Sequence, residues 1–215
     1  MTDEYKYHKY KQKYLQLKRQ LMDKYPFFIN HSTKSPDSLM RILKLGKIRL
    51  GTQVRKKDRV LSGGEAQPYI FTSMYFPDLK NYNMVPSTVL ILSSHVLNDY
   101  DAYFNKNWLY RPVSGSIKFD KNDDVSIKKD KLETAREFIK NPIELPLRLQ
   151  QSDPFRHHEL VFTEPLKIKK YLRGIVCYGC SEETIDEIRE VLRKKKYGDV
   201  KIFNTNIPDY EILDT

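Results

Sequence analysis

The stretch Phe27-Phe-Ile-Asn-His-Ser-Thr33 and the segment that follows it up to Gly46 decide the fold of this 215-residue chain. The first three residues form an apolar run, which is typical of a buried strand. Ser35-Pro36-Asp37 then has the features of a helix start, because a serine caps the helix, a proline takes its first position and an acid faces its positive end. Gly46 is placed to end this helix. The sequence therefore predicts a strand and a short helix, with the polar segment 31–33 between them.

Short apolar or β-branched runs bounded by turn residues predict the remaining strands. These runs cover residues 48–50, 69–72, 89–92, 116–119, 157–162 (with its polar end first), 172–178 and 200–203. Two more helices are predicted, one over residues 132–140 and one that begins at the capping residue Ser181 and ends in a basic last turn. We therefore expect an α/β fold, with a single domain over residues 26–215 and a separate arm over residues 1–25.

The arm is predicted to be a basic amphipathic helix of about five turns. Apolar and aromatic residues recur in it at alternating three- and four-residue steps, as on the contact face of a paired helix. These residues are Tyr7, Tyr10, Tyr14, Leu17 and Leu21. This apolar helix face either packs on the chain's own domain, which is the favoured interpretation, or pairs with a second copy of the chain. The Tyr- and Lys-rich composition of the arm resembles segments of proteins from large DNA viruses.

The charge of the chain favours polyanionic partners. The net charge is +10 and the pI is about 9.4, which suits nucleic acid or nucleotide phosphates, and the 15 tyrosines suit stacking on bases. A solvated basic surface would account for the same charge. No apolar run approaches the roughly 20 residues of a membrane span, and the N-terminus lacks the apolar core of a secretory signal. We therefore expect no membrane partner and a cytoplasmic or nuclear location.

A basic loop follows the second predicted strand and is a candidate contact for phosphate or for an acceptor substrate. It is formed by Arg55, Lys56, Lys57 and Arg59. An ordinary solvated loop is the equal alternative, because the Gly63-Gly64 pair behind it lacks the Lys-Ser/Thr of a phosphate-binding loop.

The cysteines and histidines do not predict a metal site. Cys177 and Cys180 form a CxxC pair, which supplies only two ligands for zinc, and no second pair completes the set. Two cysteines also argue against a disulfide framework, so a buried strand cysteine and a turn cysteine are favoured over a redox site. In His157-His158-Glu159 neighbouring side chains point to opposite faces of a strand. The acidic run 120–124 lacks calcium-loop spacing and is expected to be a hairpin turn.

Two polar residues at strand ends are candidates for chemistry. His31 stands between the first strand and a capped helix, where polar groups can meet phosphate or another polar ligand. Glu159 opens an otherwise apolar strand, where a carboxylate can polarise a hydroxyl or act as a base. Each has a plain structural alternative, a capped loop residue for His31 and a solvated strand end for Glu159.

Several motifs are similar to those of the ADP-ribosyltransferase fold. The segment 27–33 with its following helix resembles the start of that fold, where a His-Gly-Ser/Thr-type motif ends the first core strand. Glu159-Leu-Val-Phe162 resembles the late strand that carries the catalytic glutamate. Tyr69-Ile-Phe71-Thr-Ser73 and Asn81-Tyr82 resemble the central strand and the stacking tyrosine of the poly-ADP-ribose polymerase branch. The DNA-modifying DarT-like branch, whose basic surface accepts single-stranded DNA, is the most similar.

The resemblance implies a mixed, mostly antiparallel split sheet and an enzyme that consumes NAD. It implies that Glu159 bonds the 2′-hydroxyl of the nicotinamide ribose and stabilises the oxocarbenium character that develops as nicotinamide leaves. His31 would hydrogen-bond ribose hydroxyls, and Ser32 would pair with the carboxamide through its backbone. Thr33 would steady the nearby ribose, and Tyr82, or Tyr75 in its place, would stack on the nicotinamide ring. No metal is implied.

Two positions depart from the family pattern. Ser32 stands where the family has glycine, and Ile70 stands where the polymerase branch commonly has tyrosine. The leading hypothesis, which follows from the resemblance, is an NAD-dependent ADP-ribosyltransferase that modifies nucleic acid or protein. The alternative is a non-catalytic nucleic-acid-binding protein on the same scaffold.

Overall fold

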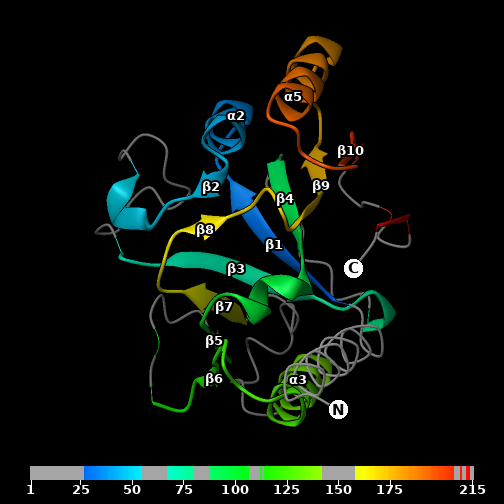
Figure 1. The fold of residues 1–215 in the computed structure, drawn as a ribbon. Helices are drawn as coiled ribbons and strands as arrows, with labels where there is room; N and C mark the ends of the chain where they lie inside the picture. Colours follow the sequence, from blue (N-terminus) through cyan, green and yellow to red (C-terminus); the bar gives the residue numbers. More distant parts are fainter. Residues whose placement is uncertain are drawn as a thin grey trace, which may run out of the picture.

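The computed structural model describes residues 27–54, 67–79, 88–106, 112, 114–141, 158–205, 209 and 212–213. Eight strands form one sheet: β1 (Phe28–Thr33), β3 (Ile70–Tyr75), β4 (Thr88–Ser93), β5 (Ala102–Asn105), β6 (Ile117–Phe119), β7 (Glu159–Phe162), β9 (Leu172–Cys177) and β10 (Lys201–Phe203). Their order in space is β10-β9-β4-β1-β3-β7-β5-β6 (Figure 1). Neighbours are antiparallel except for the parallel pair β9 and β10. The expected mixed, mostly antiparallel α/β sheet is confirmed.

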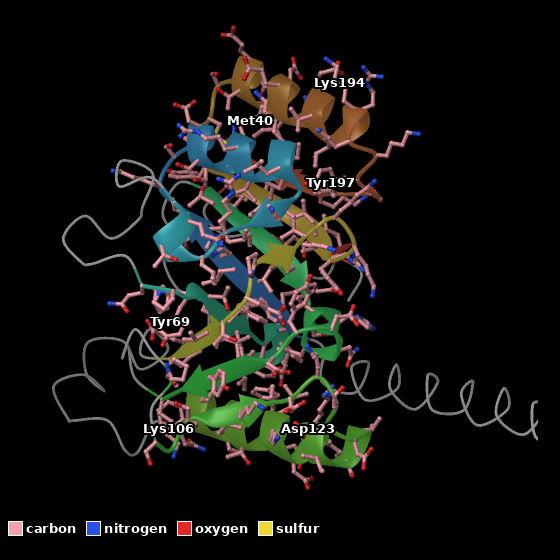
Figure 2. The ribbon with its side chains drawn as sticks, turned by 60° about the vertical axis from the view of Figure 1, so that its left-hand side comes forward. Met40, Tyr69, Lys106, Asp123, Lys194 and Tyr197 are labelled. Atoms are coloured by element: carbon pink, nitrogen blue, oxygen red, sulfur yellow. A yellow bond between two sulfur atoms is a disulfide. The ribbon has the colours of Figure 1, made fainter. Side chains whose placement is uncertain are left out.

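Helices lie near both ends of this sheet. The α-helices are α2 (Pro36–Leu45), α3 (Val125–Lys140) and α5 (Glu182–Lys194), and the short 3-10 helices are η1 (Gly51–Gln53), η3 (Pro77–Leu79) and η4 (Ser94–Asn98). Strands β2 (Lys47–Ile48) and β8 (Leu166–Lys167) form a separate antiparallel pair. Helices α2 and α5 lie side by side, and α3 lies at the other end of the sheet (Figures 1 and 2). No helix in the described part of the chain is long and apolar enough to cross a membrane.

Helix α2 forms as the sequence predicts. The Ser35 hydroxyl accepts a hydrogen bond from the Ser38 amide at 3.3 Å, and Pro36 takes the first helical position. Gly46 ends the helix with a φ of 67°, in the left-handed region that favours glycine. Beyond α5, the Tyr197 hydroxyl donates to the Leu43 carbonyl at 2.9 Å, which ties the two neighbouring helices together (Figure 2).

The core has two parts, one on each face of the sheet. Alternate residues of a strand point to opposite faces, so Ile29 and Leu90 lie on one face and Phe28 and Ile91 on the other. Ile29 and Leu90 belong to the larger cluster, which includes buried apolar residues from each of the three α-helices, and we call their side the helical face. Phe28 and Ile91 belong to a smaller cluster on the opposite face.

Some predicted elements differ from those observed. Helix α3 begins seven residues before the predicted start, because Lys128 occupies a buried helical position and interrupts the apolar pattern. Its ammonium donates to the Lys121 carbonyl at 2.9 Å. The acidic run 120–124 links β6 to α3 and is not a hairpin, β5 was not predicted, and the strand predicted over residues 48–50 is only the short β2. The helical arm over residues 1–25 lies outside the described residues.

Strand β1 pairs with β3 along only half of its length. All six residues of β1 pair with β4, whereas only Phe28, Ile29 and Asn30 pair with β3. Beyond Asn30 the link is made by a side chain, because His31 Nδ1–H donates to the Phe71 carbonyl at 3.0 Å. We call this junction of β1 and β3 the seam. The sheet is continuous, and the seam divides it into a β10-β9-β4-β1 half and a β3-β7-β5-β6 half.

Candidate active site on the face opposite the helices

Glu159 stands at the centre of a row of polar residues that crosses the seam. It opens β7 directly opposite Asn105 of β5. Phe71 of β3 pairs with Val161, so Ser73 alternates onto the same face as Glu159. Asn30 of β1 pairs with Ser73 and shares that face. Asn30, Ser73, Glu159 and Asn105 therefore form one row over four adjacent strands, which we call the polar row.

Two residues of the polar row, Glu159 and Asn105, are buried, whereas Asn30 and Ser73 are only partly buried. Glu159 is 6 % exposed and Asn105 is 1 % exposed. Asn105 Oδ1 accepts a hydrogen bond from the Ser116 hydroxyl at 2.6 Å, which orients its amide. Burial of a carboxylate is costly unless polar partners surround it, so a buried glutamate in a sheet is a candidate for function rather than for stability. The row can present a carboxylate, amides and hydroxyls to a polar ligand.

Two further predicted site residues lie on the face of Glu159. Ser32 follows Asn30 two residues along β1, and Tyr75 follows Ser73 two residues along β3, so both alternate onto that face. Tyr75 is largely buried. Burial raises the pKa of its phenol, and the negative charge of Asp78 raises this pKa further. The ring belongs to the smaller core cluster on this face.

His31 alternates onto the other face of the sheet, so the register of β1 does not bring it together with its predicted partner Glu159. In this register the neighbouring Asn30 faces the polar row and His31 faces the helical side. The His31 imidazole instead links β1 to the Phe71 carbonyl at the end of the seam. Burial lowers the pKa of His31, and the hydrogen bond to Phe71 offsets only part of this effect.

Thr33 is also turned away from the polar row. It alternates with His31 onto the helical face and is 2 % exposed. Its hydroxyl lies 2.6 Å from the hydroxyl of Thr88 on β4, and the Thr88 hydroxyl also donates to the Thr33 carbonyl at 3.2 Å. The predicted contact of the Thr33 side chain with a ribose does not fit this arrangement, because the hydroxyl is held inside the sheet.

The other predicted contacts lie outside the described residues. These are the stacking candidate Tyr82 and the basic loop residues Arg55, Lys56, Lys57 and Arg59. They stay predictions. Within the described segments, no group of three or more His, Cys, Asp or Glu side chains is placed to hold a metal ion.

His158 is a contact that the sequence did not predict. It is 2 % exposed, and its Nε2 lies within hydrogen-bond distance of both the amide nitrogen (3.2 Å) and the carbonyl oxygen (3.1 Å) of Met74. Its ring stacks on Phe104 with centroids 5.7 Å apart. These contacts fix the start of β7 against β3 and β5, directly beside Glu159. The sequence did contain a signal for this position: His158 precedes Leu160 and Phe162 at two-residue steps, so all three side chains share the face of β7 that packs in the core.

Asn30, Ser73 and Asn105 were also missed as site residues. Each is an ordinary polar residue on a strand when the sequence is considered alone. They become a group only through the pairing of β1, β3, β7 and β5, which joins segments far apart in the chain.

Two solved structures have a fold similar to that of this chain. The fold resembles that of DarT from Thermus sp. 2.9 in complex with NAD+, with a TM-score of 0.51 and 16% identity over 84% of this chain and 97% of that chain. It also resembles the same protein in complex with ADP-ribosylated ssDNA, with a TM-score of 0.52 and 15% identity over 84% and 96% of the two chains. The chain has a DarT-like fold.

The chain belongs to the family described as "Family of unknown function (DUF5846)", whose model matches residues 22–142, more than half of its length. It is also 33% identical to "Uncharacterized protein R11" of Acanthamoeba polyphaga mimivirus. That similarity extends over 94% of this chain and 80% of the relative. The expected resemblance to proteins of large DNA viruses is confirmed by this viral relative.

Proposed function

We propose that this protein is an NAD-dependent ADP-ribosyltransferase in which Glu159 is the catalytic carboxylate. The observation that carries the proposal is the polar row, with a buried glutamate between amide and hydroxyl side chains on one face of a DarT-like sheet. A structural neighbour was solved in complex with NAD+, which supports NAD as the substrate here.

In the proposed reaction, Glu159 accepts a hydrogen bond from the 2′-hydroxyl of the nicotinamide ribose. The bond between the ribose C1′ and the nicotinamide nitrogen breaks, and the electron pair leaves with nicotinamide. The carboxylate stabilises the positive charge that develops on the ribose, which is the kind of electrostatic term that dominates many catalysed steps. The acceptor nucleophile then bonds C1′, and its proton passes to Glu159 or to solvent.

The remaining groups on this face would bind and orient NAD. Ser32 keeps the role implied for it, pairing with the carboxamide through its backbone. The ring of Tyr75 would stack on nicotinamide. Asn30 takes the ribose contact that the family resemblance implied for His31, because Asn30 is the residue of this pair that shares a face with Glu159. Asn105, held by Ser116, limits the positions open to the Glu159 carboxylate.

Nucleic acid is the proposed acceptor. The net charge of +10 attracts a phosphate backbone, and this attraction precedes any specific contact with bases. A second structural neighbour was solved in complex with ADP-ribosylated ssDNA, which supports single-stranded DNA as the first acceptor to try.

The proposal predicts the outcome of a transfer assay with labelled NAD and single-stranded DNA, RNA or protein acceptors. Glu159→Gln keeps the size of the side chain and removes its charge, so transfer should fall by about a hundredfold or more. Glu164→Gln is the matched control, because Glu164 is a more exposed acid just beyond β7, paired with Lys121 at 3.8 Å, and the rate should be unchanged.

Undiminished transfer by the Glu159→Gln variant would contradict the assignment of this carboxylate. A wild-type protein that binds DNA but transfers nothing to any acceptor would instead favour the non-catalytic nucleic-acid-binding protein. Circular dichroism of both variants checks that each is folded.

A further inference from the structure

A disulfide joins Cys177 to Cys180 at the corner where β9 leads into α5. The sequence analysis favoured a buried strand cysteine and a turn cysteine; the two residues have these positions, and the structure in addition joins them by a disulfide. Their Cα atoms are 5.5 Å apart, a usual separation for a bonded pair, so the backbone of this corner suits the bond. The pair lies on no strand of the proposed transfer site and has no part in that reaction.

The two sulfur atoms differ in their access to solvent. Cys177 is the last residue of β9, is 0 % exposed and belongs to the larger core cluster. Cys180 is only partly buried, in a turn whose other residues, Tyr178 and Gly179, are exposed. A thiol or disulfide in solution can therefore approach the sulfur of Cys180, while the protein covers that of Cys177.

Cys180 also stands next to the N-terminus of α5. Ser181 caps this helix, and its hydroxyl accepts from the Thr184 amide at 3.3 Å. The partial positive charge at the start of a helix favours a thiolate there. Glu182 and Glu183 in the first turn of α5 oppose this effect, so access distinguishes the two cysteines more than charge does.

The corner is held by contacts that do not need the disulfide. The Cys180 amide donates to the Cys177 carbonyl at 3.3 Å, which closes the turn. Asn204 holds the same turn from outside, because its Oδ1 accepts from the Gly179 amide at 3.1 Å and its Nδ2 donates to the Cys180 carbonyl at 3.5 Å. A cross-link between residues three apart also restricts the unfolded chain less than one that closes a longer loop. The bond can therefore open while the fold is kept.

We propose that Cys177 and Cys180 form a reversible redox site that exchanges with disulfides in solution through Cys180. The Cys180 thiolate attacks one sulfur of an oxidised low-molecular-weight disulfide such as glutathione disulfide, and one glutathione thiolate leaves. The Cys177 thiolate then attacks the Cys180 sulfur of the mixed disulfide, forms the Cys177–Cys180 bond and releases the second glutathione. Two cysteine thiols are oxidised, one disulfide is reduced to two thiols, and the two cysteine protons end on glutathione.

The first test is a redox titration of the full-length protein. The chain is equilibrated in buffers of reduced and oxidised dithiothreitol or glutathione, and its free thiols are counted by alkylation and mass measurement. We expect a reversible two-electron transition, with unchanged circular dichroism and a melting temperature that shifts by no more than about 5 °C. A bond that opens only when the protein unfolds, or that glutathione disulfide does not restore, would overturn the proposal.

The second test compares single-cysteine variants in their reaction with glutathione disulfide. Cys177→Ala leaves Cys180, which should form the mixed disulfide at least about tenfold faster than the Cys177 left by Cys180→Ala. The mixed disulfide should accumulate in the Cys177→Ala variant and resolve in the wild type. Equal rates, or a faster Cys177, would overturn the role of Cys180. Cys177→Val fills the buried position if the alanine variant does not fold. Neither test measures ADP-ribosyl transfer, so the two proposals can fail separately.

Discussion

A step of one residue along β1 decides which side chains join Glu159. Asn30 and Ser32 lie on its face, whereas His31 and Thr33 point to the helical side, where they support the sheet. His31 bonds the Phe71 carbonyl across the seam, and Thr33 bonds Thr88. The polar segment of β1 thus supplies both the proposed site and the contacts that hold it.

Thr33→Val should weaken the fold and leave the proposed reaction unchanged. Valine keeps the shape of threonine but leaves the Thr88 hydroxyl without this partner, so the free energy of unfolding should fall by about 1 kcal/mol. Urea denaturation measures this loss. A variant as stable as the wild type but deficient in NAD turnover would instead support the predicted contact of Thr33 with the ribose of NAD.

The pKa of His31 makes stability depend on pH. Because burial lowers this pKa, the unfolded chain takes up a proton near its ordinary value of 6.5 while the folded protein does so only at lower pH. The contribution is therefore present above this value and is lost as the pH falls below it. The free energy of unfolding should fall more steeply between roughly pH 7 and pH 5 in the wild type than in His31→Gln. Parallel curves for the two proteins would show that His31 does not titrate in this way.

At the scale of elements, local signals predicted structure well wherever the deciding residues are neighbours in the chain. Helix α2 was predicted with both ends, since a capping serine and a terminal glycine act on adjacent turns. Prediction failed where a polar residue fills a buried position. Lys128 interrupts the apolar pattern over the first two turns of α3, so these turns were not predicted. Asn105 at the end of β5 made that strand resemble a loop.

Gly46→Ala should destabilise the end of α2. The added methyl group would meet only the Tyr197 hydroxyl, at 3.8 Å, so the cost arises from the φ of 67° and should be about 1 kcal/mol. Gly198→Ala is the matched control, because Gly198 has no left-handed φ and open space around its Cα, and it should be close to neutral. Thermal unfolding of both variants makes the comparison. Equal losses would show that the left-handed conformation is not what requires glycine at position 46.

At the scale of the whole molecule, the sequence predicted the fold class and the acid of the proposed site, but not its surroundings. Hydrophobic patterns identify strands, yet the order β1-β3-β7-β5 is a property of tertiary pairing. Without that order, Asn30, Ser73 and Asn105 have no visible connection with Glu159. Even the correct strands leave open which face each residue takes, because a shift of one residue reverses every side chain.

The net charge of +10 predicts salt-dependent binding to single-stranded DNA. Each phosphate that a lysine or arginine neutralises releases a counterion, so the logarithm of the affinity should fall steeply with the logarithm of the salt concentration. Fluorescence anisotropy of a labelled oligonucleotide at several salt concentrations gives the slope. A slope near zero would mean that the basic surface does not contact the phosphate backbone.

The seam also has a mechanical consequence. Three residue pairs join β1 to β3, whereas β1 and β4 pair along the full strand, so the sheet resists bending less at this junction than between β1 and β4. We call the junction the hinge and the two halves of the sheet its plates. The hinge crosses the polar row, with Asn30 on one plate and Glu159 on the other. A small rotation about it would change the gap between the groups proposed to hold NAD and the carboxylate proposed to act on it. Bending of the sheet at the seam would thus alter the geometry of the proposed site.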